Sequence, residues 1–133
     1  MFDEKPALPI KDGTTGFVVS PPPDLSLVFV SDDPDRAWAE IGPYFLHEAT
    51  TYAGWQTADI KSSVHSHATT VDELRAEGIY AILTPEQCHE RAAQSGDDGV
   101  MVLHPLCAGI PVDRAWECLH LYADEVLGAA PAA

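Results

Sequence analysis

The sequence predicts an α/β fold built around a βαβα unit in its last third. An apolar strand at 80–83 is followed at once by a helix that begins at Thr84-Pro85, and a second apolar strand at 100–103 precedes a loop and a closing amphipathic helix. Strands that alternate with helices are typical of a parallel sheet covered by helices. We expect either a partial (β/α) barrel-type unit with extra helices or its rearrangement into a compact α+β domain.

A single domain is expected for a chain of 133 residues. We place an α/β domain at 25–128, after a Pro-rich N-terminal arm at 1–24 and before a frayed tail at 129–133. The arm ends near a proline triplet at 21–23, which favours an extended polyproline conformation. With 46% hydrophobic and 21% charged residues, the chain has the balance of a globular protein.

The charge balance and the cysteines limit the classes of function. A net charge of −14 disfavours binding to nucleic acids and to anionic membrane surfaces, because both select basic patches. The three cysteines include no CxxC pair, and an odd number indicates reduced thiols. With neither a signal-peptide pattern nor an apolar run of transmembrane length, a soluble cytoplasmic protein is expected.

The first half of the domain predicts one strand and two helices. Residues 25–30 are apolar and form the first expected strand. Asp33 is placed to cap a helix with Pro34 at its first position. Gly42-Pro43 is expected to break or kink this helix, and a second helix with an aromatic face is expected over 43–55.

Local capping signals delimit the later helices. Residues 56–69 are expected to form a polar loop, and Thr70 starts a capping box whose helix would end at Gly78. The last helix is expected to open at Pro111. The apolar stripe predicted for that last helix consists of Trp116, Leu119, Ala123, Val126 and Leu127.

Two positions after strands are candidates for ligand binding. A helix that starts at Thr84 directly after a strand presents free N–H groups and its positive end at the carboxyl edge of the sheet, where phosphates bind in α/β folds. The alternative is a plain helix cap made by the Thr84 hydroxyl. His104 ends a strand and precedes a loop that contains Gly109, so it is placed to contact a cofactor, or else is a buried histidine satisfied by backbone.

Three other sets of polar residues give weaker indications of a functional site. Cys107 suggests a nucleophile, but the sequence places no general base, and the alternative is a small buried side chain. His65 and His67 supply only two ligands of the three or four that a metal site needs, so a solvated loop is the alternative and no metal site is indicated. His47 and Glu48 point about 100° apart on a helix and do not form an HExxH site.

Several segments together resemble one known family. The segments at 29–49, 80–86 and 103–111 and the closing residues 115–119 resemble, in the same order, the C-terminal region of luciferase-like flavin-dependent oxidoreductases. The resemblance covers about residues 25–128. That family is a (β/α)₈ barrel whose members use reduced FMN or a related deazaflavin for monooxygenation or hydride transfer.

The resemblance implies a cofactor site without naming a catalytic residue. It places Thr84 near the flavin phosphate, with His104 and Gly109 nearby as further cofactor-binding residues. Leu83 and Ala108 stand where the family usually, or often, has glycine, and a side chain there would crowd a phosphate. The resemblance also implies a small organic substrate.

The length of the chain leaves the implied barrel incomplete. A full barrel needs about 250 residues, so this chain would supply only the last two strands and helices with the insertion before them. The resemblance therefore implies a subunit or truncated member, completed as a homo-oligomer or by a partner chain. The alternative is a non-catalytic oligomeric binding or assembly module that keeps the scaffold without the cofactor. A third interpretation is a small metal-binding protein that uses His65 and His67.

Overall fold

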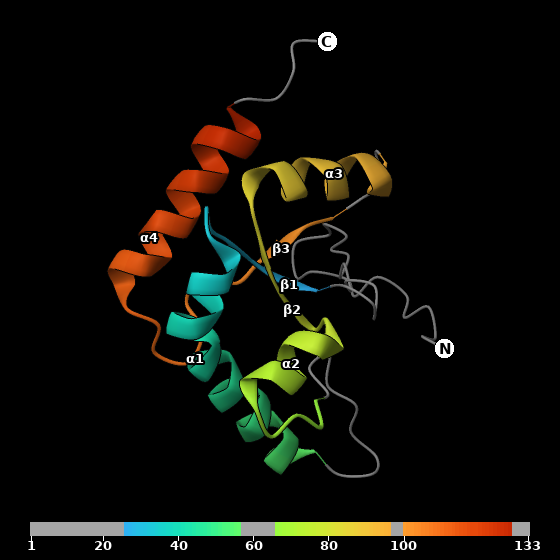
Figure 1. The fold of residues 1–133 in the computed structure, drawn as a ribbon, viewed down its shortest axis with the longest axis vertical. Helices are drawn as coiled ribbons and strands as arrows, with labels where there is room; N and C mark the ends of the chain where they lie inside the picture. The colour runs from blue at the N-terminus through green and yellow to red at the C-terminus, as the bar shows by residue number, and fades with distance from the viewer. Residues whose placement is uncertain (1–25, 57–65, 97–99, 129–133) are drawn as a thin grey trace, which may run out of the picture.

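A computed structural model describes residues 26–56, 66–96 and 100–128 of the chain (Figure 1). The described elements are, in order, β1 (Leu27–Val30), α1 (Pro34–Trp55), α2 (Val71–Glu77), β2 (Tyr80–Leu83), α3 (Pro85–Ser95), β3 (Val102–Leu103), α4 (Val112–Leu121) and the π-helix η1 (Tyr122–Leu127). The Pro-rich arm, His65 and the tail at 129–133 lie outside the described residues.

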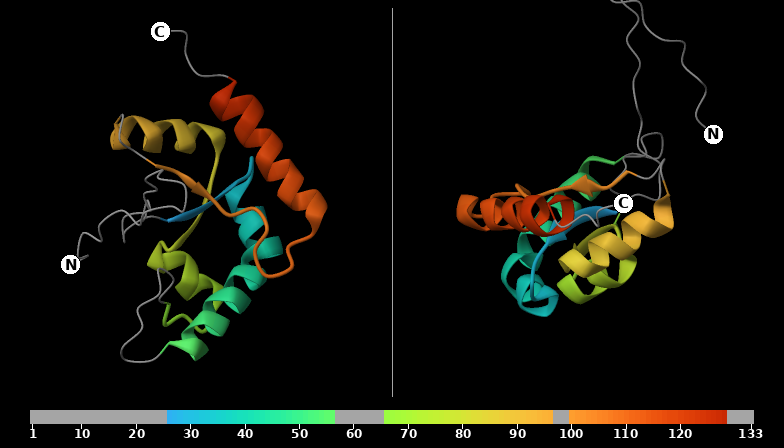
Figure 2. Two further views of the ribbon diagram at one scale, coloured as in Figure 1. Left: turned by 180° about the vertical axis from the view of Figure 1, so that it is seen from behind. Right: turned by 90° about the horizontal axis from the view of Figure 1, so that it is seen from above.

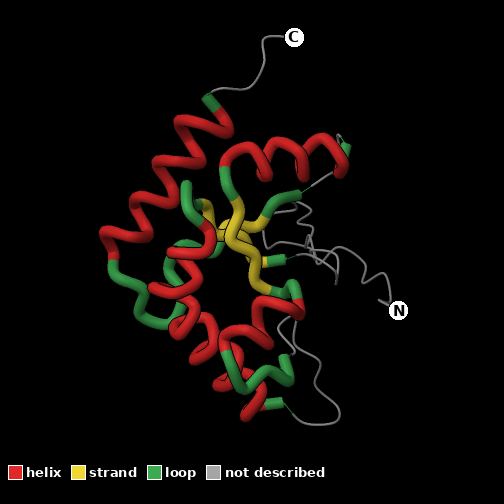
Figure 3. Tube along the Cα trace, in the orientation of Figure 1, coloured by secondary structure: helices red, strands yellow, loops and turns green. Residues whose placement is uncertain are grey.

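The sheet has three parallel strands in the order β2-β1-β3. Strand β1 pairs along its full length with β2, from Leu27 opposite Tyr80 to Val30 opposite Leu83, and its first half pairs with β3. A small parallel sheet with helices around it confirms the prediction of mixed α and β structure (Figure 3). The described strands show no barrel: β1 separates β2 from β3, whereas successive strands of a (β/α) barrel are neighbours.

The core forms where α1 covers the sheet. Val28, Phe29 and Val30 of β1 are all buried, which is the pattern of a central parallel strand. Phe45 of α1 stacks on Tyr80 of β2 with ring centroids 4.9 Å apart and meets Phe29 edge-on at 6.3 Å. Around this contact, α2 packs on α1 and β2, α4 packs on β1, and α3 lies beside η1 (Figure 2).

The predicted break at Gly42-Pro43 was wrong, because α1 is one helix of 22 residues. Pro43 is exposed, so the backbone carbonyl that it leaves without a helical hydrogen bond lies on the side of the helix where water can solvate it. Burial continues on one face before and after the proline, at Ala37, Trp38, Ile41, Gly42, Phe45 and Ala49. Packing of that face on the sheet outweighs the local proline signal.

The predicted caps of α1 and α2 are confirmed. The Asp33 carboxylate accepts a hydrogen bond from the backbone N–H of Arg36 at 3.1 Å, and Pro34 follows as the first helical residue. Thr70 caps α2, and Gly78 ends that helix with a left-handed φ of 78°. These signals were readable because each involves residues within one turn of a helix end.

The stripe predicted for the last helix was wrong in part. Helix α4 begins at Val112 rather than at Pro111, and Trp116 and Leu127 are 57% and 61% exposed. Val126 of the predicted stripe is buried, and the other buried residues are Ala115 and Cys118, which the stripe did not include. Cys118 is drawn inward because its sulfur accepts a hydrogen bond from the N–H of Val30, and the wider turns of η1 then shift the buried face along the sequence. Among the described residues, no helix has both the length and the apolar character needed to cross a bilayer.

Gly42 allows α1 and α2 to approach each other, which gives a test of the fold. A Cβ at Gly42 would lie 2.6 Å from Cγ1 of Val71. We expect Gly42→Ala to lower the free energy of unfolding by about 1–2 kcal/mol, because overpacking outweighs the gain in helix propensity. In denaturant unfolding, Gly54→Ala is the matched control: a Cβ there meets nothing within 4 Å, so a gain of about 0.5–1 kcal/mol is expected. Two equal effects would contradict this packing.

Candidate functional site

The register of β3 turns the side chain of His104 toward α1. The His104 N–H donates to the carbonyl of Val28 at 2.8 Å, which places His104 beside Phe29. Side chains of neighbouring strands at the same level share a face of the sheet, and Phe29 contacts Phe45 of α1. The imidazole therefore extends over the α1 face, where it meets Glu48 one turn beyond Phe45.

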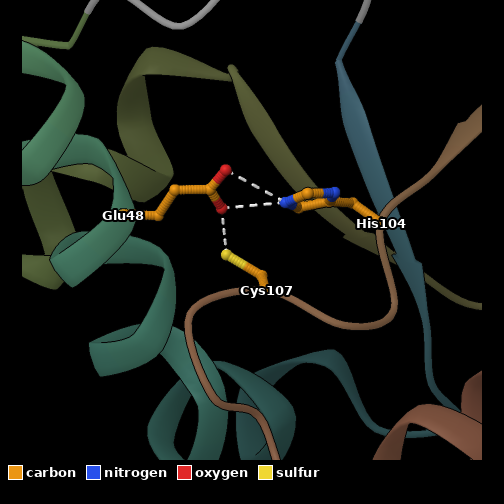
Figure 4. A group of neighbouring side chains, drawn as sticks. All are labelled: Glu48, His104 and Cys107. Atoms are coloured by element: carbon orange, nitrogen blue, oxygen red, sulfur yellow. Dashed lines mark hydrogen bonds and ion pairs between the residues drawn. The ribbon is translucent and has the colours of Figure 1, made fainter.

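Three side chains from separate elements meet at this point (Figure 4). His104 Nε2 lies 2.8 Å from Oε2 and 3.2 Å from Oε1 of Glu48. The thiol of Cys107 donates a hydrogen bond to the same Oε2 of Glu48. The Glu48 side chain is 13% exposed and that of His104 29% exposed, while Cys107 is buried. We call Glu48, His104 and Cys107 the carboxylate cluster.

A tight turn brings Cys107 back toward α1. The N–H of Ile110 donates to the carbonyl of Cys107 at 2.9 Å, and the two residues between them have positive φ, 46° at Ala108 and 88° at Gly109. This is the pattern of a type I′ turn, which favours glycine at both central positions. Ala108 therefore occupies a backbone conformation that an L-residue adopts at a cost.

Burial and the Glu48 carboxylate keep the polar groups around the cluster neutral. Burial, and then the hydrogen bond to Glu48 and its charge, raise the pKa of the Cys107 thiol well above its usual range. Burial and the same carboxylate raise the pKa of Tyr80, whose hydroxyl makes no hydrogen bond of normal geometry with the described residues. Cys107 is thus a protonated thiol at neutral pH, and the alternative of a small buried side chain describes it better than that of a nucleophile.

The other two cysteines are also free and buried. Burial raises the pKa of Cys88 to about 11, and burial raises that of Cys118 as well. No disulfide connects any two of these three cysteines. Neither Cys88 nor Cys118 has a carboxylate partner like that of Cys107.

Thr84 lies where the sequence placed it, at the carboxyl end of β2 and the start of α3. Its hydroxyl accepts from the N–H of Gln87 at 3.2 Å, and its own N–H donates to the Gln87 side chain at 3.0 Å. This complete capping box corresponds to the plain helix cap that the sequence allowed as an alternative. A ligand at this helix start would have to displace the Gln87 side chain from the N–H of Thr84.

The structure does not bring the sequence-predicted site residues into contact. Thr84 follows β2 and His104 follows β3, and β1 lies between those strands, so at least two strand spacings, or more than about 10 Å, separate them. Gly109 is exposed in the turn after β3. An open cavity of about 280 Å³ along β2 is lined by Arg75 and Arg91 but by none of the three predicted residues.

The carboxylate cluster was missed by sequence reasoning. Glu48 lies 56 residues before His104 and 59 before Cys107, so no local spacing links them. His67, considered as a ligand from its spacing, is exposed, and its partner His65 lies outside the described residues. The only sequence signal was a histidine at a strand end with a cysteine three residues later.

No family model, no curated protein and no solved structure matches this chain. The function of the chain is therefore inferred from its residues, their geometry and the resemblance of its segments.

The partly buried Glu48–His104 contact is expected to be strongly coupled. We expect Glu48→Ala to lower the free energy of unfolding by about 1.5–3 kcal/mol, because two donors lose a charged acceptor. A double-mutant cycle with His104→Ala should give a coupling energy of at least about 1 kcal/mol. The exposed pair Arg36–Glu40 is the control and should give about 0.3–0.5 kcal/mol. Equal coupling in the two pairs would contradict the burial of the cluster.

The turn after Cys107 gives a second test. Replacing Ala108 by glycine should raise the free energy of unfolding by about 0.5–1 kcal/mol, because relief of the left-handed conformation exceeds the added entropy of the unfolded chain. Ala92→Gly on the exposed side of α3 is the matched control and should lose about 1 kcal/mol. Thermal or urea unfolding measures both, and a loss of stability in Ala108→Gly would show that the turn is not left-handed there.

Proposed function

We propose that the chain is a subunit or truncated member of a luciferase-like flavin-dependent oxidoreductase, which binds FMN or a deazaflavin and acts on a small organic substrate. The observation that carries the proposal is the start of α3 at Thr84-Pro85, directly at the carboxyl end of a parallel strand. In α/β folds this edge is where nucleotide phosphates bind.

The arrangement of the resembling segments supports this proposal. The segment at 29–49 forms the end of β1 and most of α1, and the segment at 80–86 forms β2 and the start of α3. The segment at 103–111 forms the end of β3 and the turn after it. Each of the three segments contributes to a strand of the same sheet although they are far apart in the sequence. This is expected if they belong to one structural unit of the family that they resemble.

Thr84 and Gly109, the two ends of the candidate flavin site, differ in whether their polar groups are free to bind a ligand. At α3, the dipole of an 11-residue helix favours an anion, but the capping box occupies the hydroxyl and N–H of Thr84. At Gly109, a Cβ would meet nothing within 4 Å, so a ligand can approach the backbone there. The ring of His104 is directed to Glu48, so the proposal rests on Thr84 and Gly109 more than on His104.

Exposed apolar side chains support completion of the site by another chain. Leu106, Val112 and Trp116 are 63%, 59% and 57% exposed, and they lie on the turn after β3 and the helix that follows it. Val112 and Trp116 are one helical turn apart and share a face of α4. A second copy or a partner chain that supplies the rest of a barrel would cover such residues.

A non-catalytic binding or assembly module is the second candidate, and two observations favour it. Thr84 is satisfied within its own helix, and β1 lies between the two strands that would be neighbours in a barrel. Such a module would use the same exposed apolar residues without binding a cofactor. Flavin binding distinguishes the two candidates.

The test is a titration of the full chain with FMN, followed by quenching of flavin fluorescence. Saturable binding is expected, and Thr84→Asp should weaken it by about tenfold, because aspartate keeps the helix cap but repels the phosphate. Riboflavin, which lacks the phosphate, should be bound equally by Thr84→Asp and by the unaltered chain.

Thr70→Asp is the matched control, because Thr70 caps α2 in the same way at the other end of β2. Its FMN affinity should remain within about twofold of the unaltered chain, a difference below 0.5 kcal/mol. Absence of FMN binding at high micromolar concentration would reject a chain that binds flavin alone and would favour the assembly module.

A further inference from the structure

We propose that Glu48, His104 and Cys107 form a binding site for one zinc ion. The site is built from α1, the end of β3 and the turn that follows it. This inference does not rest on the proposed flavin site, because it involves neither Thr84 nor the start of α3. It also goes beyond the sequence pattern, in which only His65 and His67 were considered as metal ligands.

The chemistry of the donors matches zinc. A thiolate sulfur, an imidazole nitrogen and a carboxylate oxygen are its three common protein ligands, and one of each is present. Calcium and magnesium prefer all-oxygen sites and are disfavoured by Cys107. Three protein ligands leave one coordination position open, which is the arrangement of catalytic rather than structural zinc sites.

The distances between the donor atoms fit a single ion. All three donor atoms lie within 4.8 Å of one another. Ligand atoms about 2.0–2.3 Å from a tetrahedral zinc ion are about 3.3–3.6 Å apart. Both contacts to Glu48 therefore have to open when the ion binds: the 2.8 Å contact with His104 by less than about 1 Å, and the shorter contact with the Cys107 thiol by more than that. Glu48 comes from α1, whereas His104 and Cys107 come from one loop that faces it (Figure 4), so rotation of these side chains changes the distances between the donor atoms.

The electrostatic environment favours a cation at the cluster. Glu48 is largely buried, and none of the ion pairs formed by the described arginines involves it, since Arg36, Arg75 and Arg114 pair with other carboxylates. Its partners are a neutral thiol and the His104 imidazole, which forms an ion pair with it only when the imidazole is protonated. A divalent ion would compensate the buried carboxylate that no described guanidinium compensates.

Tyr80 supplies an independent indication of a missing ligand. The residue is only 1% exposed, and its hydroxyl makes no hydrogen bond of normal geometry with the described residues, although the Glu48 carboxylate is near enough to interact with it and buried hydroxyls nearly always have a partner. The ring lies 6.5 Å from that of His104, and the hydroxyl is close enough to Glu48 and Cys107 for their charges to affect it. A water in the open coordination position would give this hydroxyl a partner, which makes Tyr80 a positioning residue.

Binding changes the protonation of the ligands in a defined way. The thiol of Cys107 gives its proton to solvent as sulfur binds the ion, and His104 binds through Nε2 with its proton on Nδ1. One zinc ion therefore replaces the thiol proton and the hydrogen bonds that now connect the three side chains. The 29% exposure of the His104 side chain provides a route from solvent.

The experiment is a titration of the metal-free full chain with Co²⁺, followed by displacement with Zn²⁺. We expect one equivalent of Co²⁺ to produce a thiolate-to-cobalt charge-transfer absorption, which Zn²⁺ then removes. Cys107→Ser should abolish that absorption, and Glu48→Gln should weaken binding by at least about tenfold. Tyr80→Phe should keep the absorption and weaken binding by about tenfold, as removal of an outer-shell partner does.

Cys88→Ala is the control, because Cys88 is equally buried but lies outside the cluster, and it should keep the absorption. Circular dichroism checks the fold of every variant, and Zn²⁺ should raise the Tm of the unaltered chain and of Cys88→Ala but not that of a folded Cys107→Ser. The proposal is overturned if no thiolate absorption forms, or if it persists in Cys107→Ser. Binding that is lost only in His67→Ala would also overturn it and would favour the His65–His67 pair.

Discussion

The pairing of β1 on both of its edges is the constraint on which the rest of the structure depends. A strand of four residues binds β2 along its whole length and β3 over half of it. These partners come more than 50 and 70 residues later in the sequence. Their register decides which side chains share a face, and a slip of one residue would turn His104 away from α1. The carboxylate cluster is therefore a product of strand register rather than of a local motif.

Interactions between residues close together in the sequence could be predicted, whereas contacts between elements far apart in the sequence could not. The caps at Asp33, Thr70 and Thr84 were predictable because a side chain and the N–H it binds lie within three residues. The helix break at Pro43 was not, because the decisive contacts are those of α1 with the sheet. The exposure of Trp116 was missed for the same reason, since Cys118 contacts β1 instead.

For the candidate site too, the local features could be predicted from the sequence and the long-range contacts could not. Thr84 was placed correctly at the start of a helix, and His104 correctly at the end of a strand, because both follow from local patterns. The partner of His104 was not predictable, because Glu48 comes from a helix 56 residues earlier. A helical pattern alone assigns Glu48 to an amphipathic face, without indicating that the carboxylate meets a thiol.

Two possible sites thus occupy different parts of one small sheet. The start of α3 offers a helix dipole to an anion but is already capped, whereas the carboxylate cluster offers three donors to a cation. Beside the cluster, the buried Tyr80 hydroxyl makes no hydrogen bond of normal geometry with the described residues. A protonated, buried Cys107 has little use as a nucleophile, but it becomes a strong ligand when a metal replaces its proton. In a chain with a net charge of −14, cation binding is the simpler of the two to accommodate.

X-ray absorption of the zinc-loaded chain shows whether strand register assembles one cation site from Glu48, His104 and Cys107. We expect a first shell with one sulfur at about 2.3 Å and the remaining nitrogen and oxygen ligands at about 2.0–2.2 Å. A shell of nitrogen and oxygen alone would contradict it, because zinc would then be bound somewhere other than at Cys107.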